Sequence, residues 1–524
     1  MRLNKEAKAH KKTNNIKMKQ TKQIAQFLII ILFSSFTSVT YANNDTEELQ
    51  RILDSGKDLI LEKNRIYEID KKLVFVKKGQ RITTGNSKLA RDFATLKVVN
   101  PTLVTIISAE GIANIVIENI KIDGNRDYLK PEDGVVLSQP FISLGKLGGD
   151  DQLIQNCIIT NARCSGGWAA IHIHEDAFRT IVRNNIIFGV GVDVLGNGRS
   201  NWEKPFTWGD GISVAANGSL IENNLVIDPT DEGIMVQGAA NTKVLNNVVV
   251  SLSREALAGI ALIDPAAYSL MDPVNELYDY TGVLVKNNIV HALGSRVHIG
   301  YACGKDVWFS NKENKVLVGA KVVNNKFVGN VGAYGFAVAG VKDFKICGNK
   351  VNAVLETAGD GMPNNPPNKP EAFVYDPAKV SSSKLQSKFV KTDRHLVHLL
   401  RNFSHPKNEL GYRELSEYGS IEAKSIVFAA FIELLNRAPQ SSESQKWESW
   451  LQKTKGNADG VRSALINTQE FIEKNGSYSE NELQKSRSAV FYKRLENYFP
   501  ELNVLHWPKA KSLHAKLFKV YLDK

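Results

Sequence analysis

Cysteine is scarce in this chain of 524 residues, and the four cysteines show no metal-ligand spacing. The sequence also lacks a P-loop and the glycine fingerprint of a dinucleotide-binding fold, so no nucleotide cofactor is indicated. Its apolar runs are too short and too interrupted by Ser and Thr to predict a membrane span. An exported chain could pair Cys157 with Cys164, but two buried free thiols are the favoured interpretation.

The net charge of +11 is concentrated at the two ends of the chain. Residues 1–23 carry eight basic residues and one acidic residue, and the part from Ser383 onward carries 23 basic and 16 acidic residues. Each end therefore has a net charge of +7, and the middle of the chain is slightly acidic. This distribution argues against a nucleic-acid-binding core.

The amino-terminal stretch has the composition of an export signal. A short apolar run, residues 27–33, follows several lysines and precedes Ala42, which ends a suitable cleavage site. Met18 is an alternative start that would give a signal of normal proportions. We predict a signal peptide over residues 1–42 and a secreted, periplasmic or cell-surface protein, with an uncleaved amino-terminal anchor as the alternative.

A phrase of the form apolar-x-apolar-x-Asn-apolar recurs through the middle of the chain, for example at residues 115–120, 153–158 and 181–186. Successive asparagines lie about 23 to about 41 residues apart, as expected for solenoid coils with variable insertions. Asn side chains at such bends bond neighbouring backbone and, when stacked, one another. We predict an asparagine ladder made of Asn119, Asn156, Asn185, Asn224, Asn247, Asn288, Asn325 and Asn349.

These coils resemble the pectate-lyase-like superfamily of right-handed parallel β-helices over residues 43–355. The resemblance implies a mainly β fold, a single-stranded parallel β-helix of about ten coils. It also implies an amino-terminal capping helix, for which residues 45–53 are suited because a helix there can end at Gly56. Work on carbohydrates is a tendency of this superfamily.

The composition changes beyond residue 355. Residues 356–389 are rich in Pro, Asn, Gly and Ser and predict a linker, and residues 390–524 show helical spacing of apolar residues. Residues 431–439, 450–451 and 467–471 resemble a helical domain of unknown function that is common at the tails of secreted bacterial proteins. The resemblance implies an all-α accessory module without catalytic residues.

Aligning the coils predicts one sheet whose outward face carries the functional groups. We expect an outward column of His172, Ser213, Met235, Ala261 and His298. A neighbouring stripe, rich in glycine, would let an extended ligand lie close to the backbone. It consists of Ala170, Gly211, Gly233, Gly259, Arg296 and Gly335. Two insertions flank this sheet and supply aromatic residues suited to sugar rings, namely Trp202, Trp208 and Tyr268.

The titratable residues near this sheet are suited to two kinds of chemistry on a polysaccharide. Proton abstraction from a uronate needs a base, for which His172 or His174 qualifies, and a cation such as Arg254. Asp210 and Glu232 would then hold a calcium ion. Alternatively, Asp210 and Glu232 are the paired carboxylates of a glycosidase, roughly 5 Å apart on adjacent coils.

Each candidate also has a structural interpretation. An acidic residue before a glycine is commonly a turn residue, and histidines can decorate a solvated sheet face. Arg254 could form an ion pair with Glu255 or Asp231. The sequence shows neither the aspartate set typical of polygalacturonases nor the calcium-binding aspartates and paired arginines of classical pectate lyases.

We therefore predict an exported enzyme that acts on a polysaccharide, preferably one containing uronate, by β-elimination or C5 epimerisation. Hydrolysis is the other enzymatic possibility, and calcium is the candidate cofactor. The alternative is a non-catalytic β-helix that binds glycan or serves as a surface scaffold or adhesin.

Overall fold

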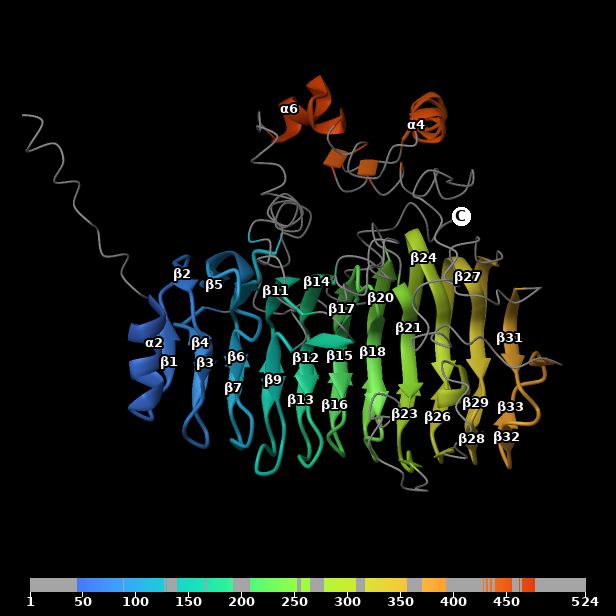
Figure 1. Ribbon diagram of the computed structural model, residues 1–524, viewed down its shortest axis with the longest axis horizontal. Helices are drawn as coiled ribbons and strands as arrows, with labels where there is room; N and C mark the ends of the chain where they lie inside the picture. Colours follow the sequence, from blue (N-terminus) through green and yellow to red (C-terminus); the bar gives the residue numbers. More distant parts are fainter. Residues whose placement is uncertain are drawn as a thin grey trace, which may run out of the picture. The chain divides into compact units, whose positions relative to one another are not determined.

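The computed structural model describes residues 45–392 with internal gaps, and selected residues between 427 and 475. The gaps fall at 88, 127–128, 130–138, 165–166, 192–207, 252–255, 264–277, 308–315 and 356–369. Between 45 and 392 the chain winds into parallel coils (Figure 1). One coil, for example, runs through β15 (Gly209–Val214), β16 (Leu220–Glu222) and β17 (Leu225–Ile227) before β18 (Glu232–Gln237) begins the next.

Strands of successive coils form three parallel ladders, which we call A, B and C. Ladder A contains β1 (Leu59–Leu61), β4 (Arg81–Thr84), β7 (Val116–Glu118), β10 (Leu153–Gln155), β13 (Ile181–Arg183), β16, β19 (Lys243–Leu245), β23 (Leu284–Lys286), β26 (Lys321–Val323), β29 (Lys345–Cys347) and β33 (Lys384–Leu385). Ladder B contains β2 (Ile66–Ile69), β5 (Thr95–Val98), β8 (Lys121–Asp123), β11 (Ile158–Ala162), β14 (Ile186–Val190), β17, β20 (Val248–Ser251), β24 (Ile289–Cys303), β27 (Lys326–Val338) and β30 (Lys350–Leu355).

Ladder C carries the candidate site. It contains β3 (Leu73–Val74), β6 (Ile107–Ser108), β9 (Ile142–Leu144), β12 (Trp168–Ile173), β15, β18 and β21 (Ala256–Ile263), then the far parts of β24 and β27, β31 (Glu371–Tyr375) and β34 (Val390–Lys391). A small fourth ladder joins β22 (Tyr278–Asp279), β25 (Leu317–Val318), β28 (Val341–Lys342) and β32 (Val380–Ser381). In the described connections lie the short 3₁₀ helices η1 (Ala90–Asp92) and η3 (Lys305–Val307).

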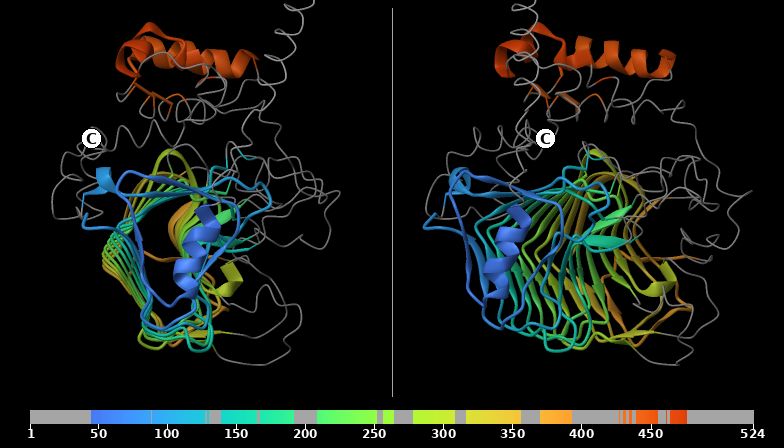
Figure 2. Two further views of the ribbon diagram at one scale, coloured as in Figure 1. Left: turned by 90° about the vertical axis from the view of Figure 1, so that its left-hand side faces the viewer. Right: turned by 60° about the vertical axis from the view of Figure 1, so that its left-hand side comes forward.

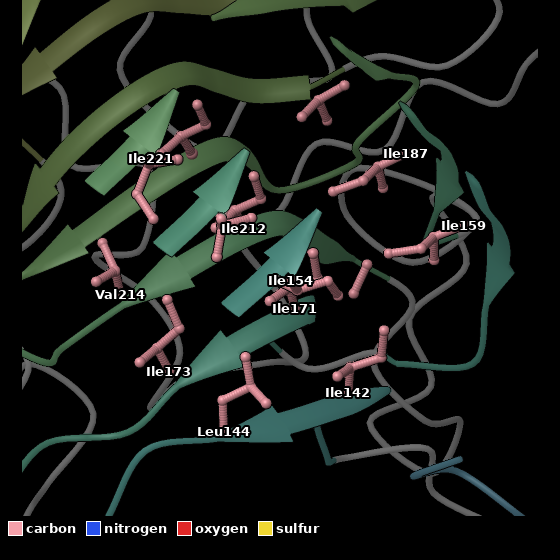
Figure 3. Packing of buried hydrophobic residues seen from close by; sticks show 14 of the residues in the cluster. Ile142, Leu144, Ile154, Ile159, Ile171, Ile173, Ile187, Ile212, Val214 and Ile221 are labelled. Atoms are coloured by element: carbon pink, nitrogen blue, oxygen red, sulfur yellow. The ribbon is translucent and has the colours of Figure 1, made fainter. Parts of the chain in front are cut away.

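Alternating apolar residues of all three ladders fill the interior of the coils. Ile171 and Ile173 of β12 and Ile212 and Val214 of β15 belong to one continuous buried cluster (Figure 3). The parallel strands bury these apolar residues without connecting helices, because each coil stacks directly on the preceding one. The predicted mainly β, parallel β-helix architecture is therefore confirmed.

The first coil is covered by helix α2 (Asp45–Asp54), which lies across the open end of the β-helix (Figure 2). Leu49 and Leu53 are buried in the main core cluster. The helix ends at Asp54 and is terminated by Gly56, whose φ of +73° is the left-handed conformation that glycine adopts readily. The predicted capping helix and its end are thus confirmed.

The asparagine ladder is present, but its amino-terminal part differs from the prediction. Six buried asparagines bond side chain to side chain at 3.0–3.1 Å along the axis, namely Asn185, Asn224, Asn247, Asn288, Asn325 and Asn349. Asn119 and Asn156 lie one position earlier in their coils, where each has a φ near +55°. They are turn residues equivalent to Asn184, and Ile120 and Cys157 take the interior positions.

The β-helix extends beyond the predicted boundary at residue 355. Strands β31, β33 and β34 pair with the preceding coils, so residues 371–391 complete a further coil. The side chain of Gln386 closes the asparagine ladder, since its Oε1 atom accepts a hydrogen bond of 3.0 Å from the backbone N–H of Asn349. The predicted linker, 356–389, is therefore in large part β-helix, and its residues 356–369 lie outside the described part.

The carboxyl-terminal part contains α4 (Ser441–Thr454) and α6 (Gln469–Asn475). Its buried apolar residues form a separate cluster, Val427, Ala430, Phe431, Leu434, Leu435, Leu451, Val461, Leu465, Ile466 and Phe471. Among the helices that the structure describes, none is both long and apolar enough to cross a membrane.

Candidate functional site

Three buried carboxylates meet at the start of two neighbouring strands of ladder C. Asp210 and Glu232 lie two residues before Ile212 and Ile234, which are paired partners on β15 and β18. Asp231 directly precedes Glu232, and one oxygen from each of the three groups lies within 4.8 Å of the others. The close approach of Asp210 and Glu232 predicted from the sequence is confirmed, and Asp231 completes a cluster of three, which we call the carboxylate cluster.

Local hydrogen bonds fix the turn that carries Asp231 and Glu232. The backbone N–H groups of Thr230 and Asp231 both donate to the carbonyl of Gly209, at 3.2 and 3.1 Å. The Thr230 hydroxyl accepts a hydrogen bond from the Gly209 N–H at 3.1 Å. The N–H of Glu232 donates to Oδ1 of Asp210 at 3.0 Å. The cluster is therefore built into the contact between two coils.

A break in strand alternation turns these carboxylates away from the core. Ala170 and Ile171 are consecutive, yet both belong to the interior cluster. Beyond the site, Ala258 and Ala261, the ladder partners of Glu232 and Met235, both belong to a separate outer cluster. Positions three residues apart, such as Asp210 and Ser213, therefore share the outward face.

The glycine stripe has a different role from the predicted one. A Cβ atom added to Gly211 or Gly233 would lie 2.4 or 2.3 Å from the interior side chains of Val226 and Val249. These glycines face the core, where no side chain fits, rather than a ligand. Gly211 follows Asp210 and Gly233 follows Glu232, because the break in strand alternation directs the residue after each carboxylate toward the core.

The predicted outward column is correct through Ala261 and wrong beyond it. Ala261 pairs with Ala302, so His298 lies four residues from the column in which the sequence placed it, and Gly300 replaces Arg296 in the glycine stripe. β24 keeps one register along both β20 and β21, so the alignment of His298 with Ala261 made from the sequence was four residues off.

Burial and mutual repulsion disfavour ionisation of the carboxylate cluster. Loss of hydration raises the pKa of all three groups, and the neighbouring carboxylates raise those of Asp210 and Glu232 further. The pKa of Asp231 is raised to about 6, and hydrogen bonding from Glu232 limits that rise. The hydrogen bonds to Asp210 and Asp231 favour the protonated form of Glu232, so the pKa of its carboxyl is raised well above the usual range.

Each carboxylate also has an oxygen that no described group satisfies. Oδ2 of Asp210, Oδ2 of Asp231 and Oε2 of Glu232 are buried without a hydrogen-bond partner in the described part of the chain. Buried acceptors of this kind are rare in proteins and indicate a site that accepts a proton, a water or a ligand.

A second group of polar residues lies on the preceding coils. The rings of Trp168 and His172 are 5.1 Å apart edge to face, and those of His172 and His174 are 4.3 Å apart. Nε2 of His174 lies 3.0 Å from the hydroxyl of Ser143, which donates to Glu110. We call these five residues the histidine cluster.

Both predicted histidines are buried rather than solvated. Loss of hydration lowers the pKa of His172 to about 3 and also lowers the pKa of His174, with the nearby Lys146 contributing. His172 pairs with Ser213, three residues beyond Asp210 on the adjacent strand. That offset puts its Cα atom about 10 Å along the strands from the carboxylate cluster. Residues of the two clusters therefore cannot both contact the same reacting bond of a substrate.

The other predicted site residues are only partly placed. Ser213 is buried, with its hydroxyl 3.9 Å from the sulfur of Met235. Trp208 is half-buried, and its carbonyl accepts a hydrogen bond from Gly167. Arg254, Trp202 and Tyr268 lie outside the described residues. Sequence reasoning missed Asp231 as a site residue, although two consecutive acids before Gly233 were the available signal.

A family model agrees with the β-helix fold over part of the chain. The family model described as "Right handed beta helix region" matches residues 52–249, which include both clusters. This agrees with the parallel coils and the right-handed winding predicted from the sequence. No curated protein matches the sequence.

Three solved structures to which this chain is similar are enzymes whose names refer to polysaccharides. The A-module of mannuronan C-5 epimerase AlgE6 from Azotobacter vinelandii is 12% identical with a TM-score of 0.37, covering 67% of this chain and 96% of that chain. An exopolygalacturonase from Thermotoga maritima is 13% identical with a TM-score of 0.34, covering 60% and 84%. The catalytic domain of a GH87 alpha-1,3-glucanase in complex with nigerose is 12% identical with a TM-score of 0.34, covering 68% and 67%. Likeness at this level concerns the fold alone.

Proposed function

We propose that this protein is an exported glycoside hydrolase that acts on a polysaccharide through Asp210, Asp231 and Glu232. The observation that carries the proposal is the carboxylate cluster, three buried groups from two adjacent coils with unsatisfied oxygens. Glycosidases need one protonated carboxyl and one ionised carboxylate beside the scissile bond. An environment that separates the pKa values of neighbouring carboxyl groups supplies both forms near neutral pH.

The electrostatics support distinct roles for the three groups. The pKa of Glu232 is raised well above its usual range, and its hydrogen bonds to both aspartates favour the protonated form, so Glu232 donates its proton to the glycosidic oxygen as the bond to the anomeric carbon breaks. Asp231 has a pKa of about 6 and is ionised at neutral pH, so it accepts a proton from the water that bonds to the anomeric carbon. Asp210 orients Glu232 through the backbone hydrogen bond and disfavours its ionisation.

The geometry supports hydrolysis better than β-elimination or C5 epimerisation. In the proposal made from the sequence, His172 or His174 was the base and Asp210 with Glu232 held calcium. His172 lies about 10 Å along the strands from these carboxylates, and His174 lies two residues further away. Arg254, the cation of that proposal, lies outside the described residues.

Calcium remains the competing occupant of the carboxylate cluster. Carboxylate oxygens are the ligands that calcium prefers, and the three groups could contribute to its coordination. A bound cation would hold all three carboxyl groups ionised and leave no proton donor. Activity that is lost with a chelator and restored by calcium would therefore contradict the acid role of Glu232.

An activity screen with matched variants tests the proposal. Purified protein is incubated with alpha-glucans, pectate, alginate, glycosaminoglycans and bacterial exopolysaccharides, with and without chelator. We expect new reducing ends without the ultraviolet absorbance of unsaturated uronates. Glu232→Gln and Asp231→Asn should each lower kcat at least about a hundredfold, since general acid–base catalysis is typically worth that much.

The control removes a carboxylate from another face of the same coil. Glu222→Gln lies on β16 of ladder A and should leave kcat unchanged. Unsaturated products, or full activity in both Glu232→Gln and Asp231→Asn, would overturn the proposal. Polysaccharide binding by wild-type protein without any cleavage would favour the binding or scaffold class.

A further inference from the structure

The histidine cluster combines an aromatic ring with an unsatisfied polar atom. Nδ1 of His172 is buried without a hydrogen-bond partner in the described part of the chain, and the residue is 6% exposed. The ring of Trp168 is half-buried beside it. A sugar ring requires this pair of features, an aromatic face for its C–H groups and polar atoms for its hydroxyls.

A chain of hydrogen bonds holds the neighbouring His174 in one orientation. Lys146 pairs with Glu110, which accepts a hydrogen bond from the Ser143 hydroxyl. Burial alone would raise the pKa of Glu110, but these contacts outweigh it and lower the pKa, so Glu110 is a carboxylate and Ser143 must donate to it. The Ser143 oxygen then accepts from Nε2–H of neutral His174, which leaves Nδ1 of His174 as an acceptor.

The cluster reaches the protein surface and adjoins the carboxylate cluster. The Lys146 side chain is 50% exposed and that of Glu110 is 31% exposed. Trp168 is the ladder partner of Gly209, which directly precedes Asp210. A bound chain could therefore contact both clusters along the outward face of ladder C.

On the other side of the carboxylates, the outward face is filled by apolar packing. The positions that follow Met235 and Glu232 along the ladder are Ala261 and Ala258, then Ala302 and Ile299. They pack in the outer cluster with Leu257, Ile263 and Val307, and all are almost completely buried. This side leaves no sugar-sized space in the described part of the structure.

We propose that the glycan extends from the carboxylate cluster toward the amino-terminal coils, with its next sugar residue bound by Trp168, His172 and His174. This proposal rests on the proposed function and adds a direction and a substrate class to it. The ring bound there is a neutral sugar, because the positive charge of Lys146 is already paired with Glu110. The described residues of the site then contact the sugar through its hydroxyls and C–H groups alone.

Steady-state kinetics on the polymer cleaved in the screen test this proposal. Trp168→Ala and His172→Ala should each raise KM about tenfold, the effect of losing about 1.4 kcal/mol of binding free energy, with little change in kcat. Trp168→Phe should retain part of the affinity. The matched control is Tyr334→Phe, which removes a hydroxyl from the apolar side of ladder C and should leave KM unchanged.

A separate binding measurement distinguishes this proposal from the proposed function. Co-sedimentation of Glu232→Gln with those polysaccharides of the screen that are insoluble, or with soluble ones coupled to beads, measures affinity without cleavage. Weaker binding when Trp168→Ala is added to Glu232→Gln supports the site even where wild-type protein cleaves nothing. Unchanged KM and unchanged binding in both Trp168→Ala and Trp168→Phe would overturn it, as would an equal rise in KM for Tyr334→Phe. Failure of wild-type protein to bind or cleave any polymer would overturn both proposals.

Discussion

The backbone N–H of Glu232 donates a hydrogen bond of 3.0 Å to the side chain of Asp210, which occupies the equivalent position on the preceding coil. This bond holds one acidic group against another in a buried setting. Such an arrangement is costly for folding unless protons are shared, because like charges cannot readily ionise together in a medium of low dielectric constant. The stability of the protein should therefore depend on pH in a way that the carboxylate cluster determines.

Asp231→Asn should stabilise the protein at neutral pH. A carboxyl group whose pKa rises from 3.8 to about 6 on folding favours the unfolded state as pH rises through that interval. Above pH 6, this pKa rise of Asp231 lowers the free energy of unfolding by about 3 kcal/mol. The variant should remove this dependence, which urea unfolding at pH 4.5 and 7.5 can measure. A variant no more stable than wild type at pH 7.5 would contradict the prediction, and Glu222→Gln is the control.

His172 should produce the opposite dependence on the acidic side. Its pKa falls from 6.5 to about 3 on folding, so the unfolded state binds a proton that the folded state does not. Stability should therefore decrease as pH falls from about 6.5 to about 3. His172→Gln should flatten this part of the stability curve, as measured by unfolding at pH 6.5 and 4.5. An unchanged slope would show that the imidazole is protonated in the folded protein.

The rate of polysaccharide cleavage should also depend on Asp231. As pH falls below about 6, Asp231 takes up a proton and no longer accepts one from water. We expect kcat to fall tenfold per pH unit on the acid side. The residual activity of Asp231→Asn should lack this acid limb. A profile flat down to pH 4 in wild-type protein would assign the base role to another group.

The sequence predicted the coils well because their signal is periodic and local. Each Asn bend recurs at solenoid spacing, and the apolar positions around it alternate as a strand requires. The position within the bend was harder to predict. Asn119 and Asn156 resemble ladder residues, yet Asn-Asn pairs show that the first asparagine takes the left-handed turn conformation and the second bonds along the axis.

The carboxylate cluster could be predicted only in part. The proximity of Asp210 and Glu232 could be predicted, because aligning the repeats of adjacent coils also aligns their neighbouring strands. The inward direction of Gly211 and Gly233 could not be predicted, because it depends on a break in alternation that no propensity signals. His298 was misplaced because β24 runs without interruption from ladder B into ladder C, so no turn between the two parts marked the register in the sequence.

The two asparagine positions of one bend should differ strongly in their effect on stability. Asn224→Ala removes the acceptor for two donors of Asn185, its backbone N–H and its side-chain amide. Leaving buried donors unsatisfied should cost about 3 to 5 kcal/mol. Asn223→Gly, at a φ of +55°, should change stability by less than about 1 kcal/mol because glycine adopts this conformation readily. Equal effects in denaturant unfolding would show that the ladder adds little beyond the turn.

Substitutions of two glycines should separate core space from backbone conformation. Gly233→Ala places a Cβ atom 2.3 Å from Val249 and 2.6 Å from the carbonyl of Gly259. Overpacking of this kind should cost about 3 kcal/mol or more. Gly218→Ala has no neighbour nearer than 3.7 Å, so its cost of about 1 kcal/mol comes from its φ of +66° alone.

Shortening the side chain opposite Gly233 tests the cause directly. In the Gly233→Ala, Val249→Ala double variant, the contact with Val249 is relieved while the contact with the Gly259 carbonyl remains. Part of the stability should therefore return relative to the sum of the two single variants, a coupling that a double-mutant cycle measures. Strictly additive losses of stability would mean that the contact with the Val249 side chain does not determine the need for glycine at position 233. The inward orientation of the glycine stripe would then not explain why the stripe consists of glycines.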